Sequence, residues 1–219
     1  MTEANLDQEK KLAAEAAAEL VQGGMAVGLG TGSTVAHLLH AIAARGLSDL
    51  RCVATSVATE DQARELGIPV EPFDRLERLD IAIDGADQIG ADRWLVKGGG
   101  GAHTREKIVA AAAERFVVIA DSSKIVDRLG PPIPLELFPF GVSATFARIH
   151  GELGAVARRE DTPVSPDGGV IADYLGEVGD PWELAAELAA LPGVVDHGLF
   201  PGLMVAEVLV GRGDSVERA

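Results

Sequence analysis

The sequence contains little that could cross-link the chain or anchor it in a membrane. Cys52 is the only cysteine among the 219 residues, so no internal disulfide can form. It lies in a predicted strand, where a buried thiol is more common than a nucleophile. The apolar runs are short and broken by glycine or charged residues, so we expect no membrane span. The polar, acidic N-terminus differs from a signal peptide, and these features together predict a cytoplasmic protein.

Basic residues are scarce as well. The 19 Lys and Arg residues face 34 Asp and Glu residues, which gives a net charge of −15. A chain this acidic is a poor general binder of nucleic acid or of anionic membranes, so we expect a small-molecule partner and neither of those. Only five of the basic residues are lysines, which makes Lys97 and Lys124 more informative than an average lysine.

Short apolar stretches alternate with amphipathic ones along the first 120 residues. This order is typical of an α/β fold, in which a mostly parallel sheet carries helices on both faces. The predicted strands are 25–29, 52–54, 68–70, 80–84, 94–96 and 116–120, and the predicted helices are 6–22, 35–45, 60–66 and 104–115.

A change of pattern at Gly130–Pro134, which holds three prolines, predicts a domain junction, because proline disrupts helices and central strands. Beyond it, two strands, a helix and a further strand indicate a small α+β domain. The apolar run 204–210 is predicted to return to the first sheet. The expected domains are therefore residues 1–130 with 201–219, and residues 131–200.

The run Gly28–Thr34 (GLGTGST) joins a predicted strand to a predicted helix. Backbone N–H groups at such a helix start suit a phosphate. A dinucleotide site is the alternative, but Ser33 replaces its third glycine, and the next strand ends in Thr55 and Ser56 instead of an acid. These departures disfavour NAD, while a turn with a purely structural role stays open.

Two further segments carry groups suited to proton transfer. Asp84 and Asp87 flank a Gly-Ala turn at the carboxyl end of a strand, where open α/β sheets place ligands, although Asp-rich turns are also common without a ligand. Lys97 precedes four glycines, which suggests close approach of a ligand to the backbone. Glu106 then opens a helix, whose dipole favours acids there and also keeps a resting base ionised.

Other candidates are weaker. Lys124 follows a strand and could reach a phosphate, as could Lys10, although a surface role is equally compatible with the sequence. His37 and His40 lie one helical turn apart, but no third ligand stands at a recognisable spacing, so we expect no metal site.

Taken in order, these stretches resemble ribose-5-phosphate isomerase of the A type. The resemblance covers most of the chain and is strongest before residue 140. Each motif is weak alone, but their combined order and spacing are specific. The matching segments are Gly28–Val35, Asp84–Asp87, Lys97–Gly101, Arg105–Ile108, Ala120–Lys124 and Gly198–Phe200.

The resemblance implies a reaction, a fold and a set of site residues. Glu106 would be the proton acceptor, and Asp84, Asp87 and Lys97 would line the reacting end of the sugar. The reaction would interconvert D-ribose 5-phosphate and D-ribulose 5-phosphate through an enediolate, in the non-oxidative pentose phosphate pathway. The implied protein has a Rossmann-like domain and a smaller α+β domain, uses no metal or cofactor, and forms a homodimer or homotetramer. The residues implied to hold substrate are Thr31, Gly32, Ser33, Thr34, Gly85, Ala86, Gly98, Gly99, Gly100 and Lys124.

Two departures and three rivals accompany this resemblance. The segment Pro163–Asp173 fits the family pattern only loosely. His103 stands where the family has an apolar residue, usually leucine, and it lies three residues before Glu106. A sugar-phosphate sensor would carry a DNA-binding helix pair and a basic surface, which this sequence lacks. The Lys97–Glu106 run argues against an amino-sugar phosphate deaminase and an acyl-CoA transferase.

Overall fold

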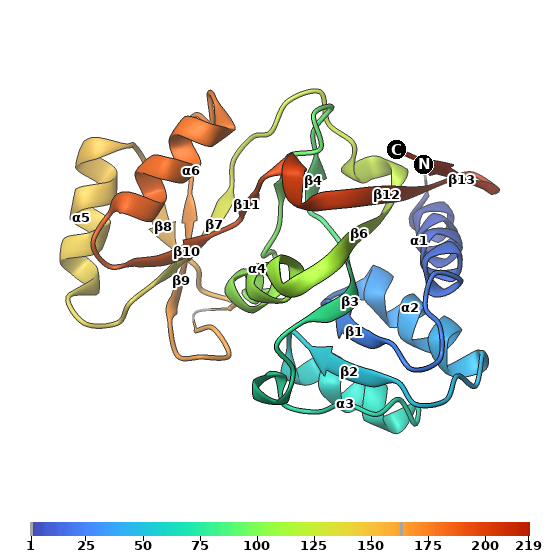
Figure 1. Cartoon of the computed structure of the whole chain (residues 1–219). Helices are drawn as coiled ribbons and strands as arrows, with labels where there is room; N and C mark the ends of the chain where they lie inside the picture. The colour runs from blue at the N-terminus through green and yellow to red at the C-terminus, as the bar shows by residue number, and fades with distance from the viewer. Residues whose placement is uncertain (1, 163) are drawn as a thin grey trace. The chain divides into compact units, whose positions relative to one another are not determined.

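The computed structural model describes residues 2–162 and 164–219, which divide into two compact units. The first unit holds the chain up to Ala86, Arg105–Lys124 and Leu203–Ala219, and the second holds Asp87–Thr104 and Ile125–Gly202. Figure 1 labels the elements of each unit. These units differ from the domain bounds expected from the proline cluster: residues 87–104 belong to the second unit, in which Leu95 and Val96 pair with Phe200 and Leu199.

The first unit is built on a six-stranded sheet of order β13-β12-β6-β3-β1-β2. All neighbouring strands are parallel except β12 and β13, which confirms the predicted mostly parallel sheet. The C-terminal apolar run forms β12 and lies beside β6. The strands are β1 (Ala26–Leu29), β2 (Arg51–Ala54), β3 (Leu79–Asp84), β6 (Ala113–Asp121), β12 (Val205–Arg212) and β13 (Ser215–Arg218).

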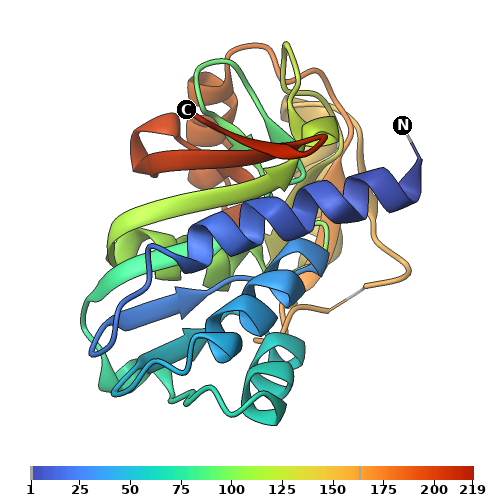
Figure 2. The same cartoon turned by 90° about the vertical axis from the view of Figure 1, so that its right-hand side faces the viewer.

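Helices cover both faces of this sheet. The helices are α1 (Glu3–Ala18), α2 (Ser33–Ala44), α3 (Val57–Glu65) and α4 (His103–Ala112), whose residues from Arg105 belong to the first unit. Figure 2 shows α1 and α2 lying side by side over the sheet. Val27 and Leu29 of β1 are buried in the core that α1 and α2 complete. Because side chains alternate along a strand, Gly28 faces the opposite side, where Val109 of α4 approaches.

The second unit contains two smaller antiparallel sheets, as expected for an α+β arrangement. The four-stranded sheet has the order β10-β7-β9-β8, and the three-stranded sheet has the order β11-β5-β4. Asp180 caps α6 by accepting hydrogen bonds from the backbone of Trp182 (2.8 Å) and Glu183. The elements are β4 (Gln88–Ile89), β5 (Leu95–Val96), β7 (Ile133–Leu137), α5 (Val142–Glu152), β8 (Val156–Arg158), β9 (Val170–Tyr174), α6 (Pro181–Ala190), β10 (Val194–His197) and β11 (Leu199–Phe200). Among the residues that the structure describes there are also three short 3-10 helices, namely η1 (Phe73–Arg75), η2 (Ser122–Lys124) and η3 (Gly202–Met204).

The proline cluster does not exclude a central strand, contrary to the expectation from the sequence. Pro134 lies in β7, which is flanked by β9 and β10. The carbonyl of Pro134 accepts a hydrogen bond from the N–H of Gly198, the residue that follows the last residue of β10. Because the nitrogen and the carbonyl of one strand residue face the same side, the nitrogen of Pro134 also faces away from β9. The missing N–H therefore removes no hydrogen bond from the pairing with β9.

In the part of the chain that the structure describes, no helix combines the length and the apolar character needed to cross a lipid bilayer.

Candidate active site

The glycine turn after β1 is bound to the end of β3. Asp84 Oδ1 accepts hydrogen bonds from Thr31 N (3.0 Å) and Gly85 N (2.7 Å). Gly30 lies so close to this carboxylate that a Cβ at position 30 would stand 2.0 Å from Asp84 Cγ. A glycine is therefore required at position 30 by close approach, and Asp84 has a structural as well as a chemical function.

The same turn is supported from the side of β2 and α3. The hydroxyls of Thr31 and Thr55 are 2.8 Å apart, and Thr59 Oγ1 donates to the carbonyl of Gly30 (2.8 Å). Both supporting threonines are buried. The polar residues that follow β2 in the sequence are the local signal for the support that Thr55 gives.

Helix α2 begins directly at the turn without a side-chain cap. Gly32 is its N-cap residue and has no side chain with which to cap the helix. Gly32 and Ser33 are exposed, whereas Thr34 is buried. An uncapped helix start with exposed N–H groups and a hydroxyl is suited to an anion.

Glu106 and Asp84 line one small pocket of the first unit. Glu106 is only 5% exposed and lies in the first turn of α4. The helix approaches the sheet closely because position 28 has no side chain: a Cβ there would lie 2.5 Å from Val109 Cγ1. The structure thus brings together two of the predicted residues that lie 22 positions apart in the chain. The pocket is lined by Gly28, Gly30, Thr55, Ala82, Ile83, Asp84, Glu106, Val109, Ala110 and Phe116.

Lys124 lies in the 3-10 turn η2, which follows β6. A buried glutamate of α1, Glu9, accepts hydrogen bonds from Ser122 N (2.9 Å), Ser122 Oγ (2.6 Å) and Gly213 N (2.8 Å). Burial raises the pKa of Glu9, but these hydrogen bonds and the charge of Arg212 outweigh it and hold the pKa below its usual value. Glu9 therefore fixes the turn that carries Lys124 as an ionised group, a function that the sequence did not reveal.

In the second unit, the glycine run lies against Asp87. Gly99 N donates to Asp87 Oδ2 (2.7 Å), and Gly99 and Gly100 are exposed. Gly98 has a φ of +101°, and a Cβ there would lie 2.6 Å from His103 Nδ1. Both the backbone conformation and the close approach therefore require glycine at position 98.

Lys97 and His103 are the buried polar residues at the two ends of this run. Lys97 is 3% exposed, and its Nζ lies 5.6 Å from the centroid of the Phe200 ring, within cation–π range. A lysine is rarely buried to this degree unless its charge has a partner or a function. His103 is fully buried and packs against the backbone of Gly98.

The remaining sequence candidates lie elsewhere. His37 Nε2 is 2.9 Å from Asp7 Oδ1, and the described residues include no group of three or more His, Cys, Asp or Glu that could hold a metal ion.

Burial, with a contribution from the charge of Glu71, raises the pKa of the Cys52 thiol to about 12, so it is not a nucleophile at neutral pH.

The fold and the pocket define a class of protein: an α/β enzyme that places carboxylates and a glycine-rich turn at the carboxyl edge of a parallel sheet. The family model of ribose 5-phosphate isomerase A (phosphoriboisomerase A) matches residues 51–215, and the chain belongs to this family of isomerases. Ribose-5-phosphate isomerase A of Caulobacter vibrioides is 47% identical over 97% of both chains.

Solved structures agree with this assignment. The enzyme named ribose 5-phosphate isomerase A from Neisseria gonorrhoeae superposes with a TM-score of 0.92 at 32% identity, over 97% of this chain and 96% of that one. A D-ribose-5-phosphate isomerase in complex with phospho-erythronic acid gives the same TM-score and identity, over 98% and 99% of the two chains.

Proposed function

We propose that this chain interconverts D-ribose 5-phosphate and D-ribulose 5-phosphate, with Glu106 as the base. The observation that carries the proposal is the convergence of two buried carboxylates, Glu106 and Asp84, beside the Gly30 turn in a chain of this family. A buried carboxylate at a helix start is shielded from water, while the helix dipole favours its negative charge, and both features suit it to act as a base towards a carbon acid.

The reaction balances as two proton transfers. After the sugar ring opens, Glu106 takes the proton from C2 of the aldose, and an enediolate forms. The same carboxylate returns the proton to C1, while the hydroxyl proton on O2 is lost and O1 gains one. Asp84, Asp87 and Lys97 are the groups proposed to assist ring opening and the transfers between oxygens.

The negative charge of the enediolate needs stabilisation, because a carboxylate alone is a weak base towards carbon acids. Lys97 supplies a buried cation, and the exposed glycines that follow it supply N–H groups. The bound ligand of the solved relative supports this proposal. Phospho-erythronic acid ends in a planar, anionic carboxylate, and an enediolate is also planar and anionic, with one oxygen on each of two adjacent carbons.

The phosphate end of the sugar is proposed to bind Thr31, Gly32, Ser33 and Thr34 together with Lys124. The uncapped start of α2 favours an anion there, and Lys124 lies in a turn that Glu9 fixes. Gly85 and Ala86 connect Asp84 to Asp87 and are proposed to contact the sugar between the two ends.

The proposed chemistry needs no metal and no organic cofactor, because a carboxylate base and a fixed cation suffice. We also propose a cytoplasmic location, a step in the non-oxidative pentose phosphate pathway, and a homodimer or homotetramer as the working assembly.

The decisive experiment is incubation with ribose 5-phosphate in heavy water. We expect ribulose 5-phosphate with deuterium at C1, because the base exchanges its proton with solvent between the two transfers. Activity should survive treatment with a chelator. If no pentose phosphate is turned over, the chain is a sugar-phosphate sensor and the proposal is wrong.

A further inference from the structure

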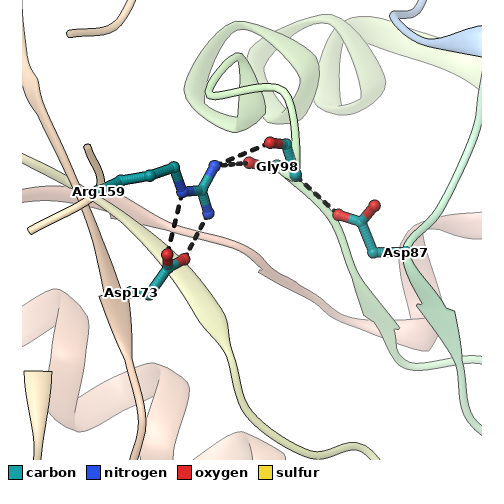
Figure 3. A network of polar contacts seen from close by, with 5 residues as sticks. Asp87, Gly98, Arg159 and Asp173 are labelled. Carbon is teal, nitrogen blue, oxygen red and sulfur yellow. Dashed lines mark hydrogen bonds and ion pairs between the residues drawn. The ribbon is translucent and has the colours of Figure 1, made fainter. Parts of the chain in front are cut away.

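An ion pair behind the glycine run holds its backbone in one orientation. Arg159 follows β8, and its Nε and Nη2 donate to the two carboxylate oxygens of Asp173 in β9, the Nε–Oδ2 distance being 3.0 Å. Arg159 Nη1 also donates to two successive carbonyls, those of Gly98 (3.0 Å) and Gly99 (2.9 Å). Figure 3 shows the guanidinium between Asp173 and the glycine run, with Asp87 on the other side of the run.

The two carbonyls determine where the glycine N–H groups point. In a trans peptide, the C=O and N–H bonds are antiparallel. The carbonyls of Gly98 and Gly99 face Arg159, so the N–H groups of Gly99 and Gly100 face away from it. The hydrogen bond from Gly99 N to Asp87 Oδ2 agrees with this orientation. Both N–H groups therefore point to the exposed side of the glycine run, the side on which Asp87 lies.

A run of glycines needs such an external constraint. Within the run, a hydrogen bond from Gly101 N to the Gly98 carbonyl (2.9 Å) closes a turn, but without side chains the peptides between them can still rotate with little steric cost. Arg159 is suited to the task because its planar fork reaches a carboxylate and two carbonyls at once, which a lysine ammonium cannot do. The pair is well shielded, with the two side chains 10% and 19% exposed, so solvent screens it little.

The guanidinium also acts on the peptides electrostatically. Hydrogen bonding to Asp173 raises the pKa of Arg159, and this effect, with the charges of Asp173, Asp161 and Asp87, outweighs burial, which lowers it. A permanent cation on the carbonyl side polarises both peptides and makes their N–H groups stronger donors towards an anion.

We infer that Arg159, held by Asp173, is a positioning residue that orients the N–H group of Gly99 towards Asp87 and that of Gly100 towards the reacting oxygens of the sugar. This inference rests on the proposed function. It assigns Arg159 no contact with substrate, and it predicts an effect on the reacting end of the sugar and none on its phosphate end.

The first test compares Arg159→Met, Arg159→Lys and Asp173→Asn with the wild type. Loss of one preorganised oxyanion donor typically costs ~10²–10³-fold in rate, so we expect kcat of Arg159→Met to fall by about 10²-fold with KM changed far less. Arg159→Lys should be nearly as impaired, because a lysine ammonium keeps the positive charge but lacks the planar guanidinium that binds both carbonyls and Asp173 at once. Asp173→Asn should show a smaller loss, because Arg159 keeps its carbonyl partners.

A second readout separates positioning from a general structural defect. Phospho-erythronic acid should bind Arg159→Met more weakly than wild type, whereas inorganic phosphate should compete equally well in both. In Arg159→Ala, added guanidinium at low millimolar concentration should restore part of kcat, while ammonium at the same ionic strength should not.

The matched control is Arg51, in the first unit. Arg51 also binds both oxygens of a carboxylate, that of Glu71, and donates to a backbone carbonyl, that of Arg75. Arg51→Met should keep wild-type kcat. Thermal unfolding of every variant checks that the fold survives.

The outcomes are distinguishable. If the wild type is active and folded Arg159→Met and Arg159→Lys keep normal kcat, the inference is wrong and the proposed function stands. If Arg159→Met does not fold, the phosphate and phospho-erythronic acid comparison is made on Asp173→Asn, and an equal loss for both probes overturns the inference. If the wild type turns over no pentose phosphate, the proposed function itself fails.

Discussion

Asp84 Oδ1 lies 3.0 Å from the backbone nitrogen of Thr31, which binds the end of β3 to the glycine turn after β1. The same oxygen accepts the N–H of Gly85, so one buried carboxylate organises two segments proposed to contact the sugar. A residue that is both structural and chemical should respond differently to removal of its hydrogen bonds and to removal of its charge.

Substitutions of Asp84 should therefore separate the two functions. Asp84→Ala leaves two N–H groups without their acceptor and should lower the free energy of unfolding by about 1–3 kcal/mol. Asp84→Asn keeps an acceptor oxygen and should lose less stability, yet its kcat should fall because the charge is gone. Urea unfolding and steady-state kinetics on both variants provide the measurement. Equal stability of the two variants would contradict the structural function.

Glu106→Gln should retain the fold and lose the reaction. A positioned general base contributes ~10²–10⁴-fold, so kcat should fall at least that far while the near-isosteric side chain preserves packing. The sharper measurement is wash-out of deuterium from C2-labelled ribose 5-phosphate, which reports the base directly. A near-normal exchange rate would exclude Glu106 as the base.

Lys97 should be needed for charge and not only for packing. Lys97→Met keeps an unbranched chain beside Phe200 but removes the cation, and Lys97→Ala removes both. We expect both variants to be badly impaired in kcat, with Lys97→Ala also less stable, because truncation of a buried side chain leaves a cavity. Full activity of folded Lys97→Met would show that the ammonium group is dispensable.

His103 is one of the two departures of this chain from the family pattern, and its substitution tests what that departure does. It is fully buried against the backbone of Gly98, which indicates a packing function that leucine can also fill. His103→Leu should therefore fold and keep kcat within a fewfold of wild type, with an unchanged pH–rate profile. A shift of the acid side of the pH–rate profile in His103→Leu would show instead that the His103 imidazole changes the ionisation of the Glu106 carboxylate.

Glu9 should contribute to stability in a pH-dependent way. Its folded-state pKa is depressed below the usual 4.5, so its stabilisation is present above that value and is lost as the pH falls through the folded pKa. Glu9→Gln should be less stable than wild type at pH 7 by about 1–3 kcal/mol, and the difference should shrink below about pH 4. Urea unfolding between pH 3 and pH 7 measures this, with inorganic phosphate affinity as a readout of the turn that carries Lys124.

The sequence predicted the parts of the site that depend on local pattern. Parallel strands end at a common edge, so Asp84 and the glycine turn could be expected to lie close, and they do. Some elements differ from the prediction: the first helix, predicted over residues 6–22, spans Glu3–Ala18, with Thr2 capping its start, and the predicted strand 68–70 forms only an isolated bridge between Val70 and Cys52.

Residues that act over long sequence separations could not be predicted. Arg159 contacts glycines about 60 positions earlier, and Glu9 contacts a turn 113 positions later. Neither carries a local signal, because an arginine after a strand and a glutamate in an alanine-rich helix are ordinary surface choices. Pro134 in a central strand could not be predicted for a related reason. A proline fits at this position only because its nitrogen faces the side on which β10 has already ended, and the sequence does not show where β10 ends.

Gly30 offers the most direct test of the packing that brings the turn and Asp84 together. Its φ is not in the left-handed region, so alanine is compatible with the backbone, and only the 2.0 Å approach of a Cβ to Asp84 Cγ opposes it. Gly30→Ala must displace a buried carboxylate held by two N–H groups, so it should be destabilised by about 1–3 kcal/mol and nearly inactive. Gly151→Ala, in helix α5 with open space around its Cβ, is the control and should be about 1 kcal/mol more stable than wild type. Thermal unfolding and isomerase assays on the two variants decide the matter: a fully active Gly30→Ala would mean that Asp84 need not occupy its observed position for catalysis.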